Sequence, residues 1–194
     1  MRFIVIFVLS GIVLTAACAA ALSGANEAVV GGAQPNATPR RAVAPREITF
    51  TDAEFDGKEV LMTDAEWKKV LTPVEYTMMR EGGTEAPFTG AFYKEHADGV
   101  YYCAACGPVL FRSKAKFDSG TGWPSFYEPA FKKNILEKED RSIGEVRTEV
   151  LCARCHAHLG HVFDDGPEPT GLRYCINSPA LRFKKAETSE SSKP

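Results

Sequence analysis

Two pairs of cysteines place the tightest constraint on what this chain can fold into. They are Cys103-Ala-Ala-Cys106 and Cys152-Ala-Arg-Cys155, with 45 residues between the pairs. A Cys-x-x-Cys turn aims two sulfurs at one point, and two such turns complete a tetrahedral zinc site. Four thiolates leave no open coordination position. The sequence therefore predicts a structural metal that clamps together two hairpins that lie far apart along the chain.

Two other uses of these cysteines remain open from the sequence. A pair of disulfides is one, because an exported protein meets an oxidising environment. Covalently attached haem is the other, because Cys152-Ala-Arg-Cys155-His156 matches the c-type attachment pattern. Haem leaves the first cysteine pair unexplained, whereas zinc uses all four thiols. Zinc is therefore the favoured prediction.

Residues 1–22 have the pattern of a secretory signal. Arg2 is followed by the apolar run Phe3–Leu14 and then by an alanine-rich stretch that resembles a cleavage site. A retained membrane anchor is the alternative, because the apolar stretch could just span a bilayer. Cys18 could also carry a lipid, although Leu14 stands one place too early for the usual lipobox. Each reading predicts an exported protein, periplasmic or extracellular, free or tethered.

The remaining chain divides into three parts. Residues 23–45 are rich in Gly, Ala, Pro and Asn, and residues 46–61 give no clear signal, so residues 23–61 are predicted to be a flexible linker. Residues 62–184 carry the ordered patterns and predict one domain, and residues 185–194 are polar and predict a disordered tail. The net charge of −2 argues against a nucleic-acid partner, which would favour a clearly basic face.

The domain is predicted to begin with two short helices and to continue as antiparallel β structure. Thr63-Asp-Ala-Glu66 is a capping box, and Thr72 before Pro73 is a second helix start. From residue 88 onward, short apolar runs alternate with turn residues, which indicates strands. Residues 140–144 join two such runs as a hairpin, and Asp98-Gly99 has the residues of another hairpin turn.

Cys175 is the cysteine in the domain that has no partner. Side chains alternate along a strand, so Arg173, Cys175 and Asn177 share one face, while Leu172, Tyr174 and Ile176 share the apolar one. A neighbouring Arg favours the thiolate, which is the nucleophilic form. A buried structural cysteine is the plain alternative.

Two further stretches favour the chemical role of Cys175. His158 and His161, separated by Leu-Gly, could converge on one site from a bent strand, and four cysteines already suffice for the metal. The segment Ser119-Gly-Thr-Gly-Trp123 permits an unusual backbone path and exposes a tryptophan that is costly to leave in water. Trp123 either fills the core or forms one wall of a small apolar pocket.

Taken in order, these motifs resemble the MsrB-type peptide-methionine (R)-S-oxide reductases. The resemblance covers roughly residues 63–184 and is carried by five motifs in register: Cys103-x-x-Cys106, Ser119-Gly-Thr-Gly-Trp-Pro-Ser-Phe126, Cys152-x-x-Cys155, His158-x-Gly-His161 and Arg173-Tyr-Cys-Ile-Asn177. It implies a mainly β fold of two antiparallel sheets, a zinc-stapled β-tent with short N-terminal helices. It also implies one structural zinc per chain and reduction of methionine-R-sulfoxide in oxidised proteins.

The resemblance also implies roles for single residues. Cys175 would attack the sulfoxide sulfur, and His161, helped by His158 through a water network, would protonate the departing oxygen. Trp123 would hold the substrate methyl group, with Phe163 as a further wall. The same resemblance gives Asn177 the polar end of the substrate and Arg173 the tuning of Cys175. The products would be methionine and a Cys175 sulfenic acid.

One position departs from the family pattern. Many members carry a resolving cysteine in the glycine loop, where this chain has Thr121. We therefore expect a one-cysteine enzyme, a monomer whose sulfenic acid is reduced by an external thioredoxin-like thiol. The competing hypothesis from the residues is a zinc-stapled binding module on the same fold, in which Cys175 is structural.

Overall fold

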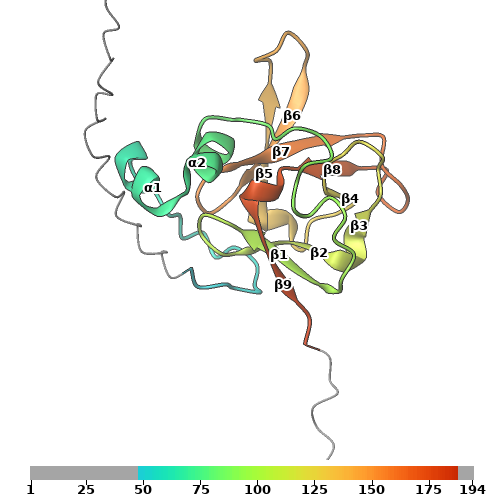
Figure 1. The fold of residues 1–194 in the computed structure, drawn as a ribbon, viewed down its shortest axis with the longest axis horizontal. Coiled ribbons are helices and arrows are strands. Elements are labelled where there is room, and N and C mark those ends of the chain that lie inside the picture. The colour runs from blue at the N-terminus through green and yellow to red at the C-terminus, as the bar shows by residue number, and fades with distance from the viewer. Residues whose placement is uncertain (1–47, 188–194) are drawn as a thin grey trace, which may run out of the picture. The chain divides into compact units, whose positions relative to one another are not determined.

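A computed structural model describes residues 48–187 of the chain (Figure 1). The predicted signal of residues 1–22, with Cys18, lies outside the described residues, as do most of the predicted linker and the end of the tail. No helix within the described part is long and apolar enough to cross a membrane. The elements are α1 (Asp64–Val70), α2 (Pro73–Arg80), β1 (Gly99–Cys103), β2 (Val109–Arg112), η1 (Ser113–Ala115), β3 (Lys116–Phe117), β4 (Ser125–Phe126), η2 (Lys132–Asn134), β5 (Ile135–Asp140), β6 (Arg147–Cys152), β7 (His158–Phe163), β8 (Arg173–Ile176), η3 (Ser178–Ala180) and β9 (Leu181–Lys185).

The strands form two antiparallel sheets, which confirms the predicted fold class. One sheet has three strands in the order β2-β1-β9, and the other has six in the order β3-β4-β8-β7-β6-β5. The hairpin predicted around residues 140–144 is confirmed as β5–β6, and its turn projects away from the body of the domain (Figure 1). The six-stranded sheet brings together strands from residues 116 to 176, so it unites most of the motifs found in the sequence.

Both predicted helix starts are confirmed. Thr63 and Thr72 each form a full capping box, in which the threonine hydroxyl and the glutamate three residues later satisfy each other's backbone amides. The helices then bury Trp67 and Met79 in the core. Arg80, the last residue of α2, donates from Nη1 to the carbonyl of Cys155 at 2.9 Å. The helical pair is therefore fastened directly to the second cysteine knuckle.

The core lies on one face of the six-stranded sheet. Phe126 of β4, Val150 of β6, and Tyr174 and Ile176 of β8 point inward from three strands of the sheet and are almost completely buried. The rings of Phe126 and Phe111, which is on the other sheet, stack with centroids 4.4 Å apart. Burying aromatic rings of this size supplies much of the free energy that holds two sheets together. The apolar face of β8 predicted from side-chain alternation is thus the core face.

Two predictions about chain organisation are wrong. Asp98-Gly99 is not a hairpin turn, because Gly99 begins β1, and the β1–β2 turn is the first cysteine knuckle itself. Residues 48–61 are not a free linker. Their backbone bonds to the domain at several points, including Phe55 N–H to Asn134 Oδ1 at 2.7 Å and Val60 N–H to the Arg154 carbonyl at 2.7 Å. Composition hid these contacts because irregular backbone carries no periodic signal.

Gly160 in β7 allows the close approach of β8. A Cβ added there would lie 2.0 Å from the carbonyl oxygen of Cys175, which is backbone and cannot move aside cheaply. A side chain at this position would therefore push β8 away from β7. The glycine in the His-Leu-Gly-His stretch is required by strand packing.

We expect Gly160→Ala to lower the free energy of unfolding by roughly 3 kcal/mol or more, because the new methyl group overpacks against backbone. Gly144→Ala is the matched control. Gly160 and Gly144 both have positive φ angles, of 156° and 84°, but a Cβ added at Gly144 meets nothing within 4 Å. The control should lose only about 1 kcal/mol, the conformational cost alone. Urea unfolding of the metal-loaded protein measures both, and equal losses would contradict the packing argument.

Candidate active site

The candidate site is the face of the six-stranded sheet opposite the core, and a β-bulge assembles it. Val150 pairs with Gly160, but Leu151 pairs with His158, so Leu159 is an extra residue. Residues three apart in a regular strand point to opposite faces, and one extra residue returns them to the same face. His158 and His161 consequently lie together, with ring centroids 5.4 Å apart. The predicted convergence of the two histidines is confirmed.

Cys175 lies at the centre of this face. On β8 it is paired with His161 of β7 on one side and with Ser125 of β4 on the other. Residues directly opposite in an antiparallel pair project to the same side, with Cβ atoms about 4.5–5.5 Å apart. The imidazole of His161 is therefore the direct neighbour of the Cys175 thiol. The thiol is partly buried and is not bonded to another described cysteine.

The sequence predicts that Arg173 favours the Cys175 thiolate, but the pKa of Cys175 is raised overall. Burial raises it above that of an ordinary thiol, and the Arg173 guanidinium and Thr121 hydroxyl offset only part of that effect. Arg173 is itself held by Asp165 through two bonds of 2.7 and 2.8 Å, and it lies 4.3 Å from the centre of the Phe163 ring. Because burial outweighs the guanidinium charge, Arg173 favours the thiolate without making it the resting form, and Asp165 adds a small effect in the same direction as burial.

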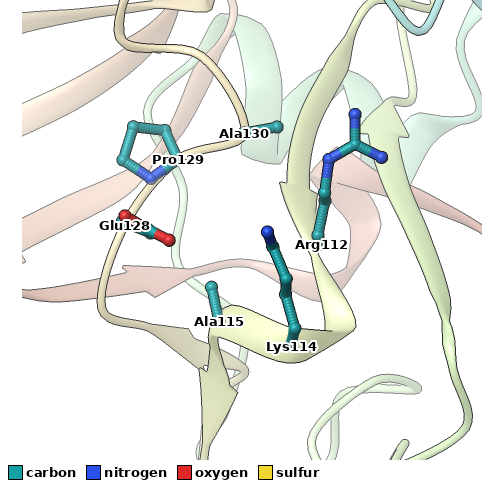
Figure 2. Close-up of a pocket in the computed structure, with 6 residues that line it drawn as sticks. All are labelled: Arg112, Lys114, Ala115, Glu128, Pro129 and Ala130. Carbon is teal, nitrogen blue, oxygen red and sulfur yellow. The ribbon is translucent and has the colours of Figure 1, made fainter.

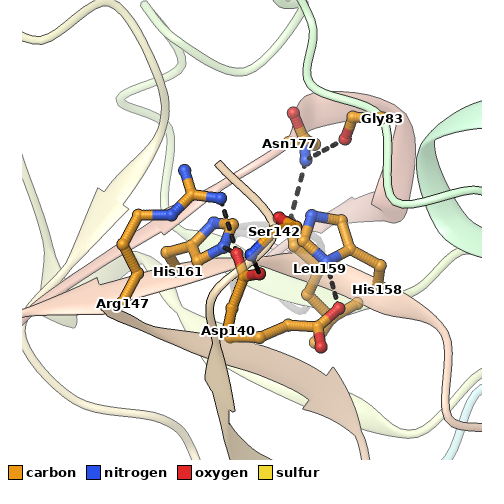
Figure 3. A network of polar contacts seen from close by, with 9 residues as sticks. Gly83, Asp140, Ser142, Arg147, His158, Leu159, His161 and Asn177 are labelled. Atoms are coloured by element: carbon orange, nitrogen blue, oxygen red, sulfur yellow. Dashed lines mark hydrogen bonds and ion pairs between the residues drawn. The ribbon is translucent and has the colours of Figure 1, made fainter. Parts of the chain in front are cut away.

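Each histidine of the pair is held by a carboxylate from the β5–β6 hairpin (Figure 3). His158 Nδ1 lies 2.7 Å from Glu149 Oε1, and His161 Nε2 lies 2.8 Å from Asp140 Oδ2. Burial lowers the pKa of His161, an effect that Asp140 partly opposes. The second ring nitrogen of His158, Nε2, is buried and has no hydrogen-bond partner within residues 48–187. A polar atom left unpaired inside a protein usually has a functional explanation.

The glycine loop forms another edge of the site. Ser119 Oγ bonds both the Thr121 and the Ser125 hydroxyls at 2.8 Å, so the loop folds back over β4. Trp123 is partly exposed, and its Nε1–H donates to the carbonyl of Glu85 at 3.1 Å. Its ring therefore stays partly accessible, and it is not a core plug. This geometry suits a wall for a small apolar group.

Asn177 has a different setting from the one expected for a residue that meets substrate. Its side chain is buried, and its Oδ1 accepts from the Glu85 amide at 3.0 Å. Its Nδ2 donates to the carbonyls of Gly83 and Leu159, at 3.3 and 3.4 Å. The amide is thus bonded to backbone on both sides. Its observed role is to fix the segment after α2 against β7, behind the histidine pair.

The four knuckle cysteines form a buried cluster. Their ligand atoms all lie within 4.8 Å of one another, with Cys103 Sγ 3.7 Å from Cys155 Sγ and Cys106 Sγ 3.6 Å from Cys152 Sγ. Four sulfurs around a tetrahedral ion bound at about 2.3 Å are about 3.8 Å apart, so the cluster fits a metal such as zinc. Hydrogen bonding to Cys103 and its neighbours raises the pKa of Cys106. A cation would be needed to deprotonate all four thiols.

The same geometry opposes both alternatives for the cysteines. A disulfide requires sulfurs about 2.05 Å apart, and the described cysteines are free thiols whose nearest sulfurs lie across the two knuckles. For haem attachment, Cys152 and Cys155 would have to face an open surface. They are instead buried beside the other two cysteines, and His156 lies at the surface, 3.3 Å from Glu59.

Two pockets in the described domain lie apart from this chemistry. One, of about 90 Å³, lies between the end of β2 and residues 128–130, with Arg112 and Lys114 on one side and Glu128 on the other (Figure 2). The other, of about 320 Å³, is bordered by Phe92 and Leu181. Neither contains Cys175 or the histidines. The reactive groups cluster instead on the face of the six-stranded sheet that carries Cys175 and the two histidines.

Sequence reasoning missed the supporting carboxylates and cations of the site. Asp140 was assigned only to a hairpin turn, and Glu149 and Arg147 carried no motif of their own. The alternation of Arg147 and Glu149 along β6 places both on one face and was a usable signal. Asp140 carried no comparable signal, because its closeness to His161 depends on pairing across the intervening strand β6.

The fold and site together define a β domain with a four-cysteine cluster fit to hold a metal, which presents one histidine-flanked thiol. Comparison with known proteins agrees with this class. The SelR domain matches residues 71–185. The peptide methionine sulfoxide reductase MsrB of Thiobacillus denitrificans is 60% identical over 121 residues, covering 62% of this chain and 92% of that protein. The protein of the same name from Leptospira interrogans is 58% identical over 128 residues, covering 66% and 97%. The chain belongs to the SelR domain family, the MsrB-type methionine sulfoxide reductases.

Proposed function

We propose that this protein is a peptide-methionine (R)-S-oxide reductase that returns methionine-R-sulfoxide in oxidised proteins to methionine. The observation that carries the proposal is the Cys175 residue paired directly with His161 on the face of the sheet opposite the core. The printed names of the related proteins support the reaction class. The preference for the R epimer rests on membership of the family.

Cys175 supplies the two electrons for the reduction. Its sulfur attacks the sulfoxide sulfur, the sulfur–oxygen bond of the substrate breaks, and the oxygen ends on Cys175. A thiol and a sulfoxide thus become a sulfenic acid and a thioether, with two electrons passing from Cys175 to the methionine sulfur. Trp123 offers the apolar wall for the methyl group, and Phe163 lies nearby beneath Arg173. Arg173 stabilises the thiolate as it forms.

The proton required by the departing oxygen comes from the thiol itself. Because burial raises the pKa of Cys175 and lowers that of His161, the free site carries a protonated thiol beside a neutral imidazole. His161 can accept the proton as Cys175 attacks and deliver it to the oxygen. His158 supports the same step with its free Nε2, which is buried next to His161.

The residue at position 121 determines how the Cys175 sulfenic acid is reduced back to the thiol. Thr121 stands beside Cys175, where a resolving cysteine would have to lie, and the other described cysteines are committed to the buried cluster. Two external thiol groups of a thioredoxin-like protein would therefore reduce the sulfenic acid to the thiol, forming a disulfide between them with release of water. This one-cysteine cycle is part of the proposal.

A single-turnover experiment tests the assignment of the nucleophile. The mature protein, incubated with a peptide carrying methionine-R-sulfoxide and no reductant, should yield up to one equivalent of methionine and a sulfenic acid on Cys175. Mass spectrometry after trapping with a sulfenic-acid reagent measures both. Cys175→Ser should lose turnover by at least about 10³-fold, as expected when a nucleophile is removed, and should keep its fold.

The same samples can contradict the proposal in two ways. Turnover by Cys175→Ser close to that of the original protein would remove Cys175 from the reaction. A disulfide joining Cys175 to another cysteine after one turnover would refute the one-cysteine cycle and leave the reductase activity standing. The S epimer serves as the matched substrate control, and equal turnover of both epimers would contradict the R preference.

We propose that the cluster holds one structural zinc ion, with Cys103, Cys106, Cys152 and Cys155 as ligands. A bound zinc would tie the β1–β2 turn to the β6–β7 turn. Native mass spectrometry should give the mass of one chain plus one zinc, because every residue of the site comes from a single chain. Cys106→Ser should lose the metal and unfold at a markedly lower temperature. A metal-free native protein would contradict the zinc proposal, and a dimer would contradict the expectation of a monomer.

We also propose that the protein is exported and works in the periplasm or outside the cell. The support is the charged start, apolar run and alanine-rich end of residues 1–22. The intact mass of the chain recovered from its native cell should correspond to a start near residue 23. A mass that adds a lipid at Cys18 would support the tethered form, and an intact residue 1 on a protein in the cytoplasm would overturn export.

A further inference from the structure

The β5–β6 hairpin contributes a charged cluster whose purpose the proposed reaction does not yet explain. Asp140 ends β5, and Arg147 begins β6 directly opposite it. Asp140 Oδ2 lies 2.8 Å from His161 Nε2 and 2.5 Å from Arg147 Nη2. Its other oxygen, Oδ1, accepts from the Ser142 amide at 2.9 Å. The carboxylate thus has partners on both oxygens, and one partner is the histidine next to Cys175 (Figure 3).

We propose that Asp140 is the positioning residue of His161, and that Arg147 and Ser142 hold Asp140 in place for that purpose. This inference rests on the proposed function, because it assigns His161 to proton transfer. Asp140 sets the orientation of the His161 ring and determines which of its two nitrogens is free to exchange a proton. With Nε2 committed to the carboxylate, Nδ1 is the nitrogen left for exchange with the thiol and the substrate oxygen.

The contact between His161 and Asp140 is largely shielded from solvent. The side chains of His161 and Asp140 are 11% and 14% exposed, so water screens their interaction only weakly. Hydrogen bonds from Ser142, then from His161 and Arg147, hold the pKa of Asp140 well below that of an ordinary carboxylate. Asp140 therefore remains ionised over the working pH range. An ionised carboxylate beside an imidazole fixes its tautomer and favours its protonated form.

The neighbours of His161 set the direction of the expected effect. Asp140 raises the pKa of His161, while burial, Arg147 and His158 lower it. Removing the carboxylate charge must therefore lower this pKa further, and removing the Arg147 charge must raise it. The charged and titratable groups that face His161 are Asp140 on β5, Arg147 and Glu149 on β6, His158 on β7, and Cys175 and Arg173 on β8, with Asp165 bonded to Arg173.

The first test is the titration of the His161 ring by NMR on the full mature protein with its metal bound. The signal can be assigned with a His161→Asn sample. Asp140→Asn keeps the shape of the side chain and removes its charge, so the His161 midpoint should move to lower pH. Arg147→Met should move it to higher pH. Because the two variants shift the midpoint in opposite directions, a general loss of packing cannot imitate the pair of results.

The second test is the kinetics of the same variants. Asp140→Asn should lower kcat on the order of tenfold near neutral pH, the factor given by one unit of pKa. KM should stay within about twofold, because Asp140 contacts His161 and not the substrate wall. The limb of the kcat profile that reports His161 should move to lower pH. Glu139→Gln is the matched control: Glu139 is the preceding residue and pairs with exposed Arg141.

The outcomes separate this inference from the proposed function. An active wild-type protein with an unchanged kcat profile and an unchanged His161 midpoint in Asp140→Asn would overturn the positioning role. Equal losses in Glu139→Gln and Asp140→Asn would also overturn it, since the effect would then belong to the hairpin as a whole. A wild-type protein inactive on both epimers would refute the proposed function, while the NMR titration would still decide whether Asp140 controls His161.

Discussion

The pairing of β7 with its two neighbours is the constraint on which the active face depends. Leu159 is the extra residue between His158 and Gly160, whose β6 partners are consecutive, and this bulge turns both histidines to one side. On the other edge, the register of β7 with β8 sets His161 opposite Cys175. A slip of one residue in either pair would turn these side chains into the core face. The chemistry therefore depends on hydrogen-bond register before it depends on any side-chain contact.

The knuckle cluster and the helices protect this register. Cys155 and His158 are separated by two residues, so the cysteine cluster lies at the very start of β7. Arg80 of α2 donates to the carbonyl of Cys155, and Asn177 joins the end of β8 to β7 and to the segment after α2. Scaffold and reactive groups share the same short strands. A disturbance of the cluster would consequently act directly on the start of β7, where His158 lies.

Protonation in the site follows from burial more than from charge. Arg173 acts in the direction predicted from the sequence, but its charge is shared with Asp165, and desolvation of Cys175 outweighs it. Desolvation also keeps His161 neutral. A protonated thiol next to a neutral imidazole stores one movable proton, the number needed to convert a sulfoxide and a thiol into a thioether and a sulfenic acid. The site is therefore matched in proton count to the proposed reaction.

The sequence by itself determined the local features of this protein. It located the two capped helices, the β5–β6 hairpin, the four-cysteine cluster and the alternation that separates Cys175 from the core, because each depends on neighbouring residues or on a short period. Only the tertiary structure decided that residues 48–61 are held to the domain and that Asn177 is bonded to backbone. It alone also decided that Asp140 reaches His161 and that burial prevails over Arg173 at Cys175. These features depend on strand register and desolvation, which are set by residues distant in the chain and leave no local pattern.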